Sequence, residues 1–340
     1  MDERRHGGRL EVPRPEPRAS GGRVAIGVDL GGTHARAAVI DGRGAVLSAC
    51  KRTLSDRTPE AVADLLAAAT HEAIRDAGQS EANVAAVGVG AAGQIHSGTG
   101  VVAVGPNLGW RDVPFAELLR QRLPWPVLLM NDLSAAAWGE RSVGAGDSAD
   151  DVLLYFVGSG IGSGLILDGS LYEGSGGVAG EVGHTKVVPG GRLCGCGEQG
   201  CLEAYCGGHN LSLRVAEAIA AGRASALATV KPPVYAADIE RAALAGDGLA
   251  RELWDECARL LSVSLANYVT LLNPARVILG GGVLLSCPEL RRTVEARVFE
   301  LALRASRQGL QLVDARLGDD AGVVGSGLRA LESVVPGAES

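Results

Sequence analysis

A segment near the beginning of the chain recurs near its middle. Residues 23–42 (RVAIGVDLGGTHARAAVIDG) and 151–169 (DVLLYFVGSGIGSGLILDG) align at a constant offset of 127 residues, which places Gly31 on Gly158. Each segment has the pattern of a buried strand, a glycine turn, a second strand and an Asp-Gly turn. An internal repeat of this kind predicts two lobes built on one plan.

The rest of the chain has the pattern of an α/β protein. Apolar runs typical of buried strands occur at 84–93, 125–132 and 275–285, and helical spacing occurs at 58–78, 207–222, 235–271 and 319–334. We expect a small α/β lobe made of residues 23–132 and 319–334, and a large α/β lobe made of residues 133–318.

Composition limits the partners that the chain can have. Its 340 residues are 46% hydrophobic, enough for the cores of two lobes, and its net charge of −7 offers no basic face for nucleic acid. No apolar stretch reaches the roughly 18 residues of a membrane span, and the N-terminus lacks the apolar region of a signal peptide. We therefore expect a cytoplasmic protein, with residues 1–22 as a disordered tail of mixed charge, Pro and Gly.

Glycines follow the first strand of each repeat. In GVDLGGTHARA (27–37) they free backbone N–H groups to approach phosphate oxygens, and Thr33 adds a hydroxyl donor. Asp29, at the end of the strand, could hold Mg²⁺ through water. An ordinary glycine hairpin explains either turn alone, and the lysine of a P-loop is absent. Because GSGIGSG (158–164) repeats the turn on the other lobe, we predict a phosphate clamp between the lobes.

Asn131 and Asp132 stand where a buried strand ends and a helix begins. Both residue types are preferred helix N-caps, so capping alone explains them. The functional interpretation is a carboxylate at the carboxyl end of a strand, where α/β folds bind ligands, placed to accept a proton from a substrate hydroxyl. The sequence leaves both interpretations open.

Three of the seven cysteines fall within the eight residues CGCGEQGC (194–201). Three thiolates and one imidazole make a tetrahedral structural zinc site, and the intervening glycines let the loop fold round an ion. The ligands would be His184, Cys194, Cys196 and Cys201. A closed site has no open position for a substrate, so we expect the metal to stabilise the conformation of a loop. Glu181, His184 and Glu203 of this loop would then hydrogen-bond a polyol. The remaining cysteines are interpreted as core or surface residues: Cys50, Cys206, Cys257 and Cys287.

Taken together, these residues resemble the ROK family (repressors, open reading frames and kinases) of sugar kinases. The resemblance runs from about Arg23 to the last helix. It rests on DLGGTHARAAVID, GAAGQIHSGTGVV, PNLGWRDVPF, NDLSAAAWGE, GSGIGSG, GEVGHTKVVPGGRLCGCGEQGCLEAY and VILGGG. It implies the duplicated, ribonuclease H-like fold shared with actin and hexokinase, with ATP and sugar in the cleft between the lobes.

The resemblance also implies roles for individual residues, with Asp132 as the catalytic base. It implies sugar ligands at Asn107, Asn131, Glu181, His184 and Glu203. It implies phosphate contacts at Gly31, Gly32, Thr33, Ser159 and Gly160, and an adenosine side at Gly280, Gly281 and Gly282. The zinc ligands named above match the zinc set of the family. Two positions depart from the family pattern: His34 stands where members often have Lys, and Ser159 where they often have Thr.

These expectations describe a kinase that uses ATP and Mg²⁺ to phosphorylate a hexose hydroxyl, with a structural Zn²⁺. Glucose is the first choice, because PNLGWRDVPF and CLEAY look most like glucokinase members. N-acetylhexosamine, mannose, fructose or an amino sugar would need the same catalytic residues, and polyphosphate could replace ATP. We expect a homodimer or homotetramer.

Two other classes of protein compete with the kinase. A sugar-responsive repressor needs a helix-turn-helix before the first lobe, and the 22 residues before Arg23 show no helical pattern. A catalytically inactive sugar-binding module would not require Asp132 or the two glycine turns, and this chain has all three.

Overall fold

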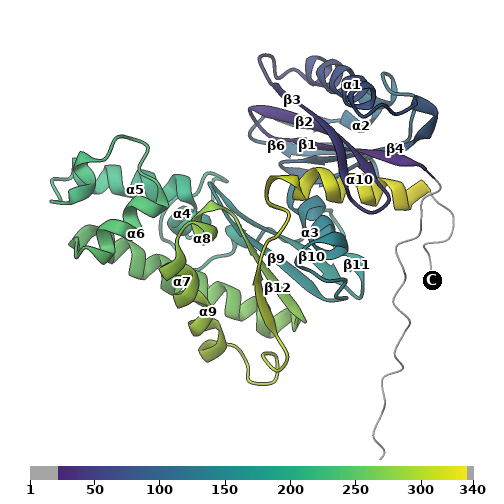
Figure 1. Ribbon diagram of the computed structural model, residues 1–340. Coiled ribbons are helices and arrows are strands. Elements are labelled where there is room, and N and C mark those ends of the chain that lie inside the picture. Colours follow the sequence, from purple (N-terminus) through teal and green to yellow (C-terminus); the bar gives the residue numbers. More distant parts are fainter. Residues whose placement is uncertain (1–21, 335–340) are drawn as a thin grey trace, which may run out of the picture.

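The chain folds into two lobes, each built on a five-stranded sheet (Figure 1). The computed structural model describes residues 22–334, so the tail expected over residues 1–22 lies, apart from Gly22, outside the described residues. The strand order is β3-β2-β1-β4-β8 in the first sheet and β11-β10-β9-β12-β13 in the second. In both sheets an antiparallel hairpin is joined by a third strand parallel to its first strand. The duplicated plan predicted from the sequence repeat is thus confirmed.

The first sheet comprises β1 (Val24–Leu30), β2 (His34–Asp41), β3 (Val46–Thr53), β4 (Val84–Ala91) and β8 (Val127–Asn131). Its central strands β1 and β4 are buried almost throughout because helices cover both faces of the sheet. One face is covered by α1 (Pro59–Asp76) and α2 (Phe115–Arg120), the other by α10 (Ala321–Val334), as Figure 1 shows. The remaining elements are η1 (Glu81–Asn83) and a small sheet of β5 (Gln94–His96), β6 (Val101–Gly105) and β7 (Trp110–Val113).

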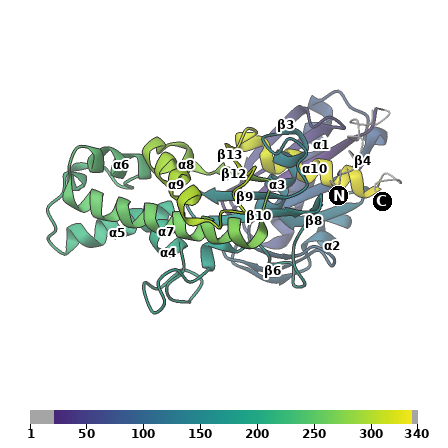
Figure 2. The same cartoon turned by 90° about the horizontal axis from the view of Figure 1, so that it is seen from below.

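The second sheet comprises β9 (Val152–Val157), β10 (Ile161–Leu167), β11 (Ser170–Leu171), β12 (Arg276–Gly280) and β13 (Gln311–Asp314). The shorter helices of this part of the chain are η2 (Val182–His184), α4 (Glu203–Cys206), η3 (Ala226–Thr229), α8 (Gly282–Leu285) and η4 (Gly318–Asp320). The longer ones are α5 (Gly208–Ala220), α6 (Ala236–Leu244), α7 (Gly248–Leu272) and α9 (Pro288–Leu301). Figure 2 shows α5 and α6 at the end of the molecule away from the first lobe. No helix between residues 22 and 334 is both long and apolar enough to cross a membrane.

The continuous helical pattern expected at 235–271 is interrupted in the structure. Gly246 has a φ of +94°, outside the helical region, and ends the first helix. Asp247 then caps the second helix, because its carboxylate accepts a hydrogen bond from the Ala250 N–H at 2.9 Å. The result is two helices, α6 and α7, that pack against each other.

Two helices lie between the sheets: α10 packs on the first sheet, and α3 (Asp132–Val143) packs on β10 of the second. Helices α3 and α10 approach each other closely because glycine has no side chain at the contact. A Cβ atom on Gly325 would lie 1.7 Å from the Ala135 carbonyl oxygen. Gly27 of β1 similarly lies against α10, where a Cβ atom would be 1.8 Å from the Val323 carbonyl oxygen. We propose accordingly that residues 23–132 and 319–334 form the small lobe and residues 133–318 the large one.

Candidate active site

The first glycine turn connects β1 to β2. Gly31 donates its N–H to the His34 carbonyl at 3.0 Å, which closes the turn. Asn107 lies against this turn, since a Cβ atom on Gly32 would be 2.7 Å from the Asn107 Cβ atom. Thr33 is exposed beside it. The structure therefore places Gly31, Gly32, Thr33 and Asn107 together.

The second glycine turn connects β9 to β10 and contacts the start of α5. Gly158 donates its N–H to the Gly160 carbonyl at 2.9 Å, while Gly208 and His209 donate theirs to the carbonyls of Gly158 and Ser159 at 2.9 and 3.0 Å. The glycines after β12 lie next to this turn. Gly281 has a φ of +87°, and a Cβ atom there would be 2.4 Å from the Val157 carbonyl oxygen. Gly280 and Gly281 thus lie against Phe156, Val157 and Gly158, where the second glycine turn begins, and Gly282 follows them as the first residue of α8.

Asn131 is the N-cap of α3, and this separates the two interpretations that the sequence left open. The Asn131 side-chain oxygen accepts hydrogen bonds from the N–H groups of Leu133 at 2.9 Å and Ser134 at 3.1 Å. Its amide group donates to the Gly93 carbonyl at 3.0 Å. With its oxygen committed to capping, Asn131 can contact a ligand only through its amide N–H groups.

Asp132 is the first residue of α3 and is half-buried. Its Oδ1 atom accepts a hydrogen bond from the Leu133 N–H at 2.9 Å. Burial raises the pKa of Asp132, the Leu133 hydrogen bond lowers it, and the negative charge of Glu181 raises it further. Asp132 and Glu181, 49 positions apart in the sequence, are therefore close enough for their charges to interact.

Glu181, His184 and Glu203 are gathered by the loop that carries the cysteines. The Glu181 carboxylate lies 3.9 Å from His184 Nε2. Burial raises the pKa of Glu181; the His184 ring lowers it and the charge of Glu203 raises it. Glu203 Oε2 accepts a hydrogen bond from the Ile161 N–H at 2.7 Å, directly after the second glycine turn. The loop is thus tied to that turn, and a Cβ atom on Gly160 would be 2.6 Å from the same carboxylate oxygen.

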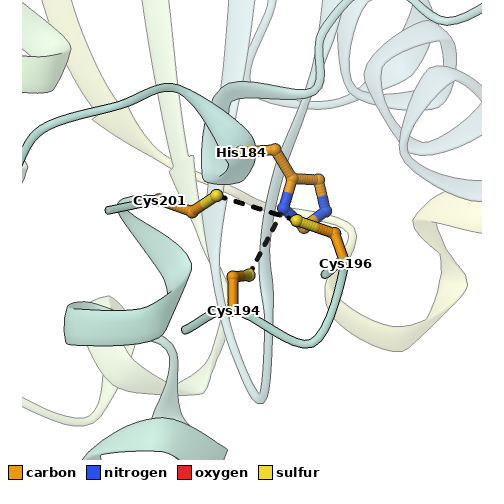
Figure 3. Close-up of side chains that lie close together, drawn as sticks. All are labelled: His184, Cys194, Cys196 and Cys201. Atoms are coloured by element: carbon orange, nitrogen blue, oxygen red, sulfur yellow. Dashed lines mark hydrogen bonds between the residues drawn. The ribbon is translucent and has the colours of Figure 1, made fainter. Parts of the chain in front are cut away.

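His184, Cys194, Cys196 and Cys201 form one cluster (Figure 3), with their ligand atoms all within 4.8 Å of one another. The Cys196 and Cys201 sulfurs are 3.7 Å apart, and the Cys194 sulfur is 3.7 Å from His184 Nδ1. Tetrahedral zinc with ordinary bond lengths puts two sulfurs about 3.8 Å apart and a sulfur and a nitrogen about 3.6 Å apart. These two separations match a tetrahedral Zn²⁺ site, and the donor set of three thiols and one imidazole fits the same ion. The sequence left the other cysteines as core or surface residues, and all four are buried: Cys50, Cys206, Cys257 and Cys287.

Asp29 lies in a pocket of about 480 Å³ beside the first glycine turn. Burial raises its pKa to about 6, the charges of Asp132 and Asp319 raise it, and Arg36 and Lys51 lower it. Sequence reasoning found Asp29 but missed Arg36, Lys51 and Asp319. Arg36 and Lys51 line the pocket because the register of β1, β2 and β3 places them beside Asp29. Asp319 lines it because the chain comes back to the first lobe just before α10. The only local indication in the sequence was the alternation of polar and apolar residues at the start of β2, which places Arg36 on the opposite face from its alanine neighbours.

The site and fold together define a two-lobe phosphotransferase of the hexokinase type, with a glycine turn on each lobe and a carboxylate between them. The chain belongs to the ROK family, which matches residues 25–332. It is 33% identical over 307 residues to a glucokinase from Halalkalibacterium halodurans, a match that covers 89% of this chain and 93% of the relative.

Two solved structures extend the comparison. The ROK hexokinase from Thermus thermophilus is 35% identical with a TM-score of 0.78, and the match covers 92% of this chain and 100% of that one. A ROK family glucokinase from Streptomyces griseus, solved in complex with glucose and AMPPNP, is 36% identical with a TM-score of 0.75, covering 91% of this chain and 99% of that one.

Proposed function

We propose that this chain is an ATP-dependent hexokinase that converts glucose to glucose 6-phosphate. The observation that carries the proposal is the place of Asp132, a partly buried carboxylate at the start of α3, where burial and the negative charge of Glu181 raise its pKa as expected for a general base. The glycine turns on both sides supply N–H groups for phosphate. The glucokinase relatives, and the Streptomyces griseus structure with glucose and AMPPNP, support both substrates.

Asp132 is the proposed general base. Its raised pKa makes it a stronger base toward an alcohol proton than an exposed aspartate. The Leu133 N–H holds one carboxylate oxygen at 2.9 Å, which leaves the other for the sugar hydroxyl. As the hydroxyl oxygen bonds to the terminal phosphorus and the bond to the leaving phosphate breaks, Asp132 takes the proton. The glycine turns hold phosphate oxygens in line, and positioning of this kind supplies most of the catalysis in phosphoryl transfer.

The residues around Asp29 fit Mg²⁺. Its carboxylate is destabilised by burial and by Asp132 and Asp319, and Arg36 and Lys51 compensate this only in part, so a divalent cation would relieve the remaining charge. Asp29 and Asp319 would hold the ion, which when bound would neutralise charge on the donor phosphates.

Zinc at the cysteine cluster would act by fixing the position of sugar-binding side chains and would not take part in the reaction. Four protein ligands close the site, so it cannot bind a substrate. A metal on His184 Nδ1 leaves Nε2 as a donor facing Glu181, which fixes the ring as part of the proposed sugar site. The proposed sugar ligands are Asn107, Asn131, Glu181, His184 and Glu203.

The test is a screen of hexoses against phosphoryl donors. Purified protein is assayed with glucose, mannose, fructose, glucosamine and the N-acetylhexosamines, using MgATP or polyphosphate and detecting the sugar phosphate by mass spectrometry. We expect the highest kcat/KM with glucose and ATP. A higher kcat/KM for another hexose would replace glucose but keep the kinase; turnover of none by zinc-loaded protein would favour a sugar-sensing regulator.

We also propose that the protein is a homodimer or homotetramer in the cytoplasm. Leu271, Leu301 and Leu303 are 77%, 54% and 57% exposed near the ends of α7 and α9, and their burial by a second copy would be favourable. The thiol cluster favours a reducing compartment. Light scattering after size-exclusion chromatography measures the number of chains, and a monomer at micromolar concentration would contradict the assembly.

A further inference from the structure

Three charged side chains form a row across the first sheet. Asp29 of β1 is paired in register with Arg36 of β2, and Arg36 is paired with Lys51 of β3. Residues directly opposite each other share a face of a sheet, so the three side chains point to the same side. That is the side of α10, since a Cβ atom on Gly322 would lie 3.4 Å from the Asp29 carboxyl carbon.

This row lines the pocket of about 480 Å³ together with Gly31 and Thr33 of the first glycine turn. The pocket is therefore the first-lobe part of the proposed donor site. The proposed adenosine side, at Gly280–Gly282, belongs to the second lobe. The charge of Asp132 acts on Asp29, so the pocket lies on the side of the proposed base, where the phosphoryl group of the donor would be transferred.

Among the residues that the structure describes, one cationic group of this pocket forms no hydrogen bond or ion pair, although its charge acts on Asp29. The Arg36 guanidinium forms an ion pair with Asp320 at 2.6 Å. The His34 ring shares a hydrogen bond with the Thr33 hydroxyl at 3.0 Å through Nδ1. The Lys51 ammonium group is exposed and forms no hydrogen bond or ion pair with any residue from 22 to 334. It is free to bind an anion.

The position of Lys51 on the edge strand gives a simpler reason for its charge, because lysines at sheet edges discourage pairing with other chains. That reason requires a charge anywhere along the edge and would be met by arginine. Of the 32 Lys and Arg residues, three are lysines: Lys51, Lys186 and Lys231. Edge protection also does not explain why Lys51 faces the carboxylate of Asp29 across the pocket.

We propose that Lys51 is a ligand for the phosphate chain of the donor, at the end remote from the nucleoside. The inference rests on the proposed kinase function and adds a residue to it. An ammonium group is a compact cation with three donors, which binds phosphate oxygens without demanding one orientation. Because Lys51 contacts phosphate and not the base, its contribution is equal for ATP and GTP.

Chemical labelling tests the contact directly. Limited acetylation followed by peptide mass spectrometry reports the reactivity of each lysine, with exposed Lys231 as the internal reference. We expect Mg-AMPPNP to lower the reactivity of Lys51 at least about five-fold, while Lys231 is unchanged and glucose alone has no effect. Calorimetry on the same sample measures AMPPNP binding. Binding without protection of Lys51 overturns this inference alone; absence of binding overturns the kinase proposal with it.

Substitutions test the energetic part. A charge-assisted hydrogen bond predicts that Lys51→Gln lowers kcat/KM for ATP by about 10- to 100-fold and for GTP by the same factor, with KM for glucose unchanged. Lys51→Arg should recover most of the loss, and Lys231→Gln is the matched control with wild-type kinetics. A Lys51→Gln protein whose KM and kcat for ATP stay within two-fold of wild type, or whose loss appears in KM for glucose, contradicts the assignment.

Discussion

Removing the charge of Asp29 should make the protein more stable and inactive at the same time. Burial, with the neighbouring charges of Asp132 and Asp319, raises the pKa of Asp29 from 3.8 to about 6. The folded state therefore binds this proton more tightly than the unfolded chain does. It follows that the ionised carboxylate destabilises the fold at neutral pH.

The size of the effect follows from the two pKa values. Below pH 3.8 both states are protonated and the carboxyl group has no cost; as pH rises the unfolded state loses the proton first, and the cost is complete above about pH 6. The loss of stability amounts to about 1.6 kcal/mol at pH 5 and about 3 kcal/mol at pH 8. Asp29→Asn keeps the shape and removes the charge, so Tm should rise by roughly 5 °C at pH 8 and by about half as much at pH 5.

Scanning calorimetry at the two pH values, without Mg²⁺ or nucleotide, measures this change, and the same samples are assayed for hexokinase activity. The matched control is Asp255→Asn, an exposed position on α7, where Tm should stay constant. If Asp29→Asn lowered Tm, or raised it equally at pH 5 and pH 8, the argument from burial would be refuted.

Three further changes have distinct expected outcomes. Asp132→Asn should lower kcat by about 10²- to 10⁴-fold while folding and glucose binding persist in calorimetry; near-normal turnover would remove its role as base. Cys196→Ser should lose the one zinc per chain in elemental analysis and weaken glucose binding but not AMPPNP binding; full activity in native protein with freely titratable thiols would contradict the zinc site. Gly281→Ala should destabilise the protein by about 1–3 kcal/mol and weaken nucleotide binding, because of its positive φ and the Val157 carbonyl at 2.4 Å. Gly248→Ala, at a position on α7 where a Cβ atom meets open space, should do neither, and equal behaviour of the two variants in denaturant titration would be evidence against the strain.

The features that the sequence predicted are those encoded in short stretches. The zinc cluster depends on Cys194, Cys196 and Cys201 lying within eight residues, so loop geometry brings them together whatever the rest of the chain does. The duplicated fold was visible because each repeat is a hairpin with its turn chemistry inside it.

The features that the sequence did not reveal depend on alignment between distant segments. The row of Asp29, Arg36 and Lys51 exists because two registers agree, and a shift by one residue would turn the side chains to opposite faces. Asn131 and Asp132 are equally good caps by residue type, and their division of roles is set by backbone position at the start of α3. The break at Gly246 was hidden by the apolar periodicity on both sides of it.

The position of α10 has a consequence for synthesis on the ribosome. This helix follows the entire second lobe in the sequence, yet it covers one face of β1 and β4 in the first. A nascent chain that has not reached residue 321 would leave that face open to solvent, including the surface at Gly27 that fits the backbone of α10. The first lobe to be translated is thus the last to complete its fold. Its cotranslational intermediate exposes apolar surface of the kind that chaperones bind.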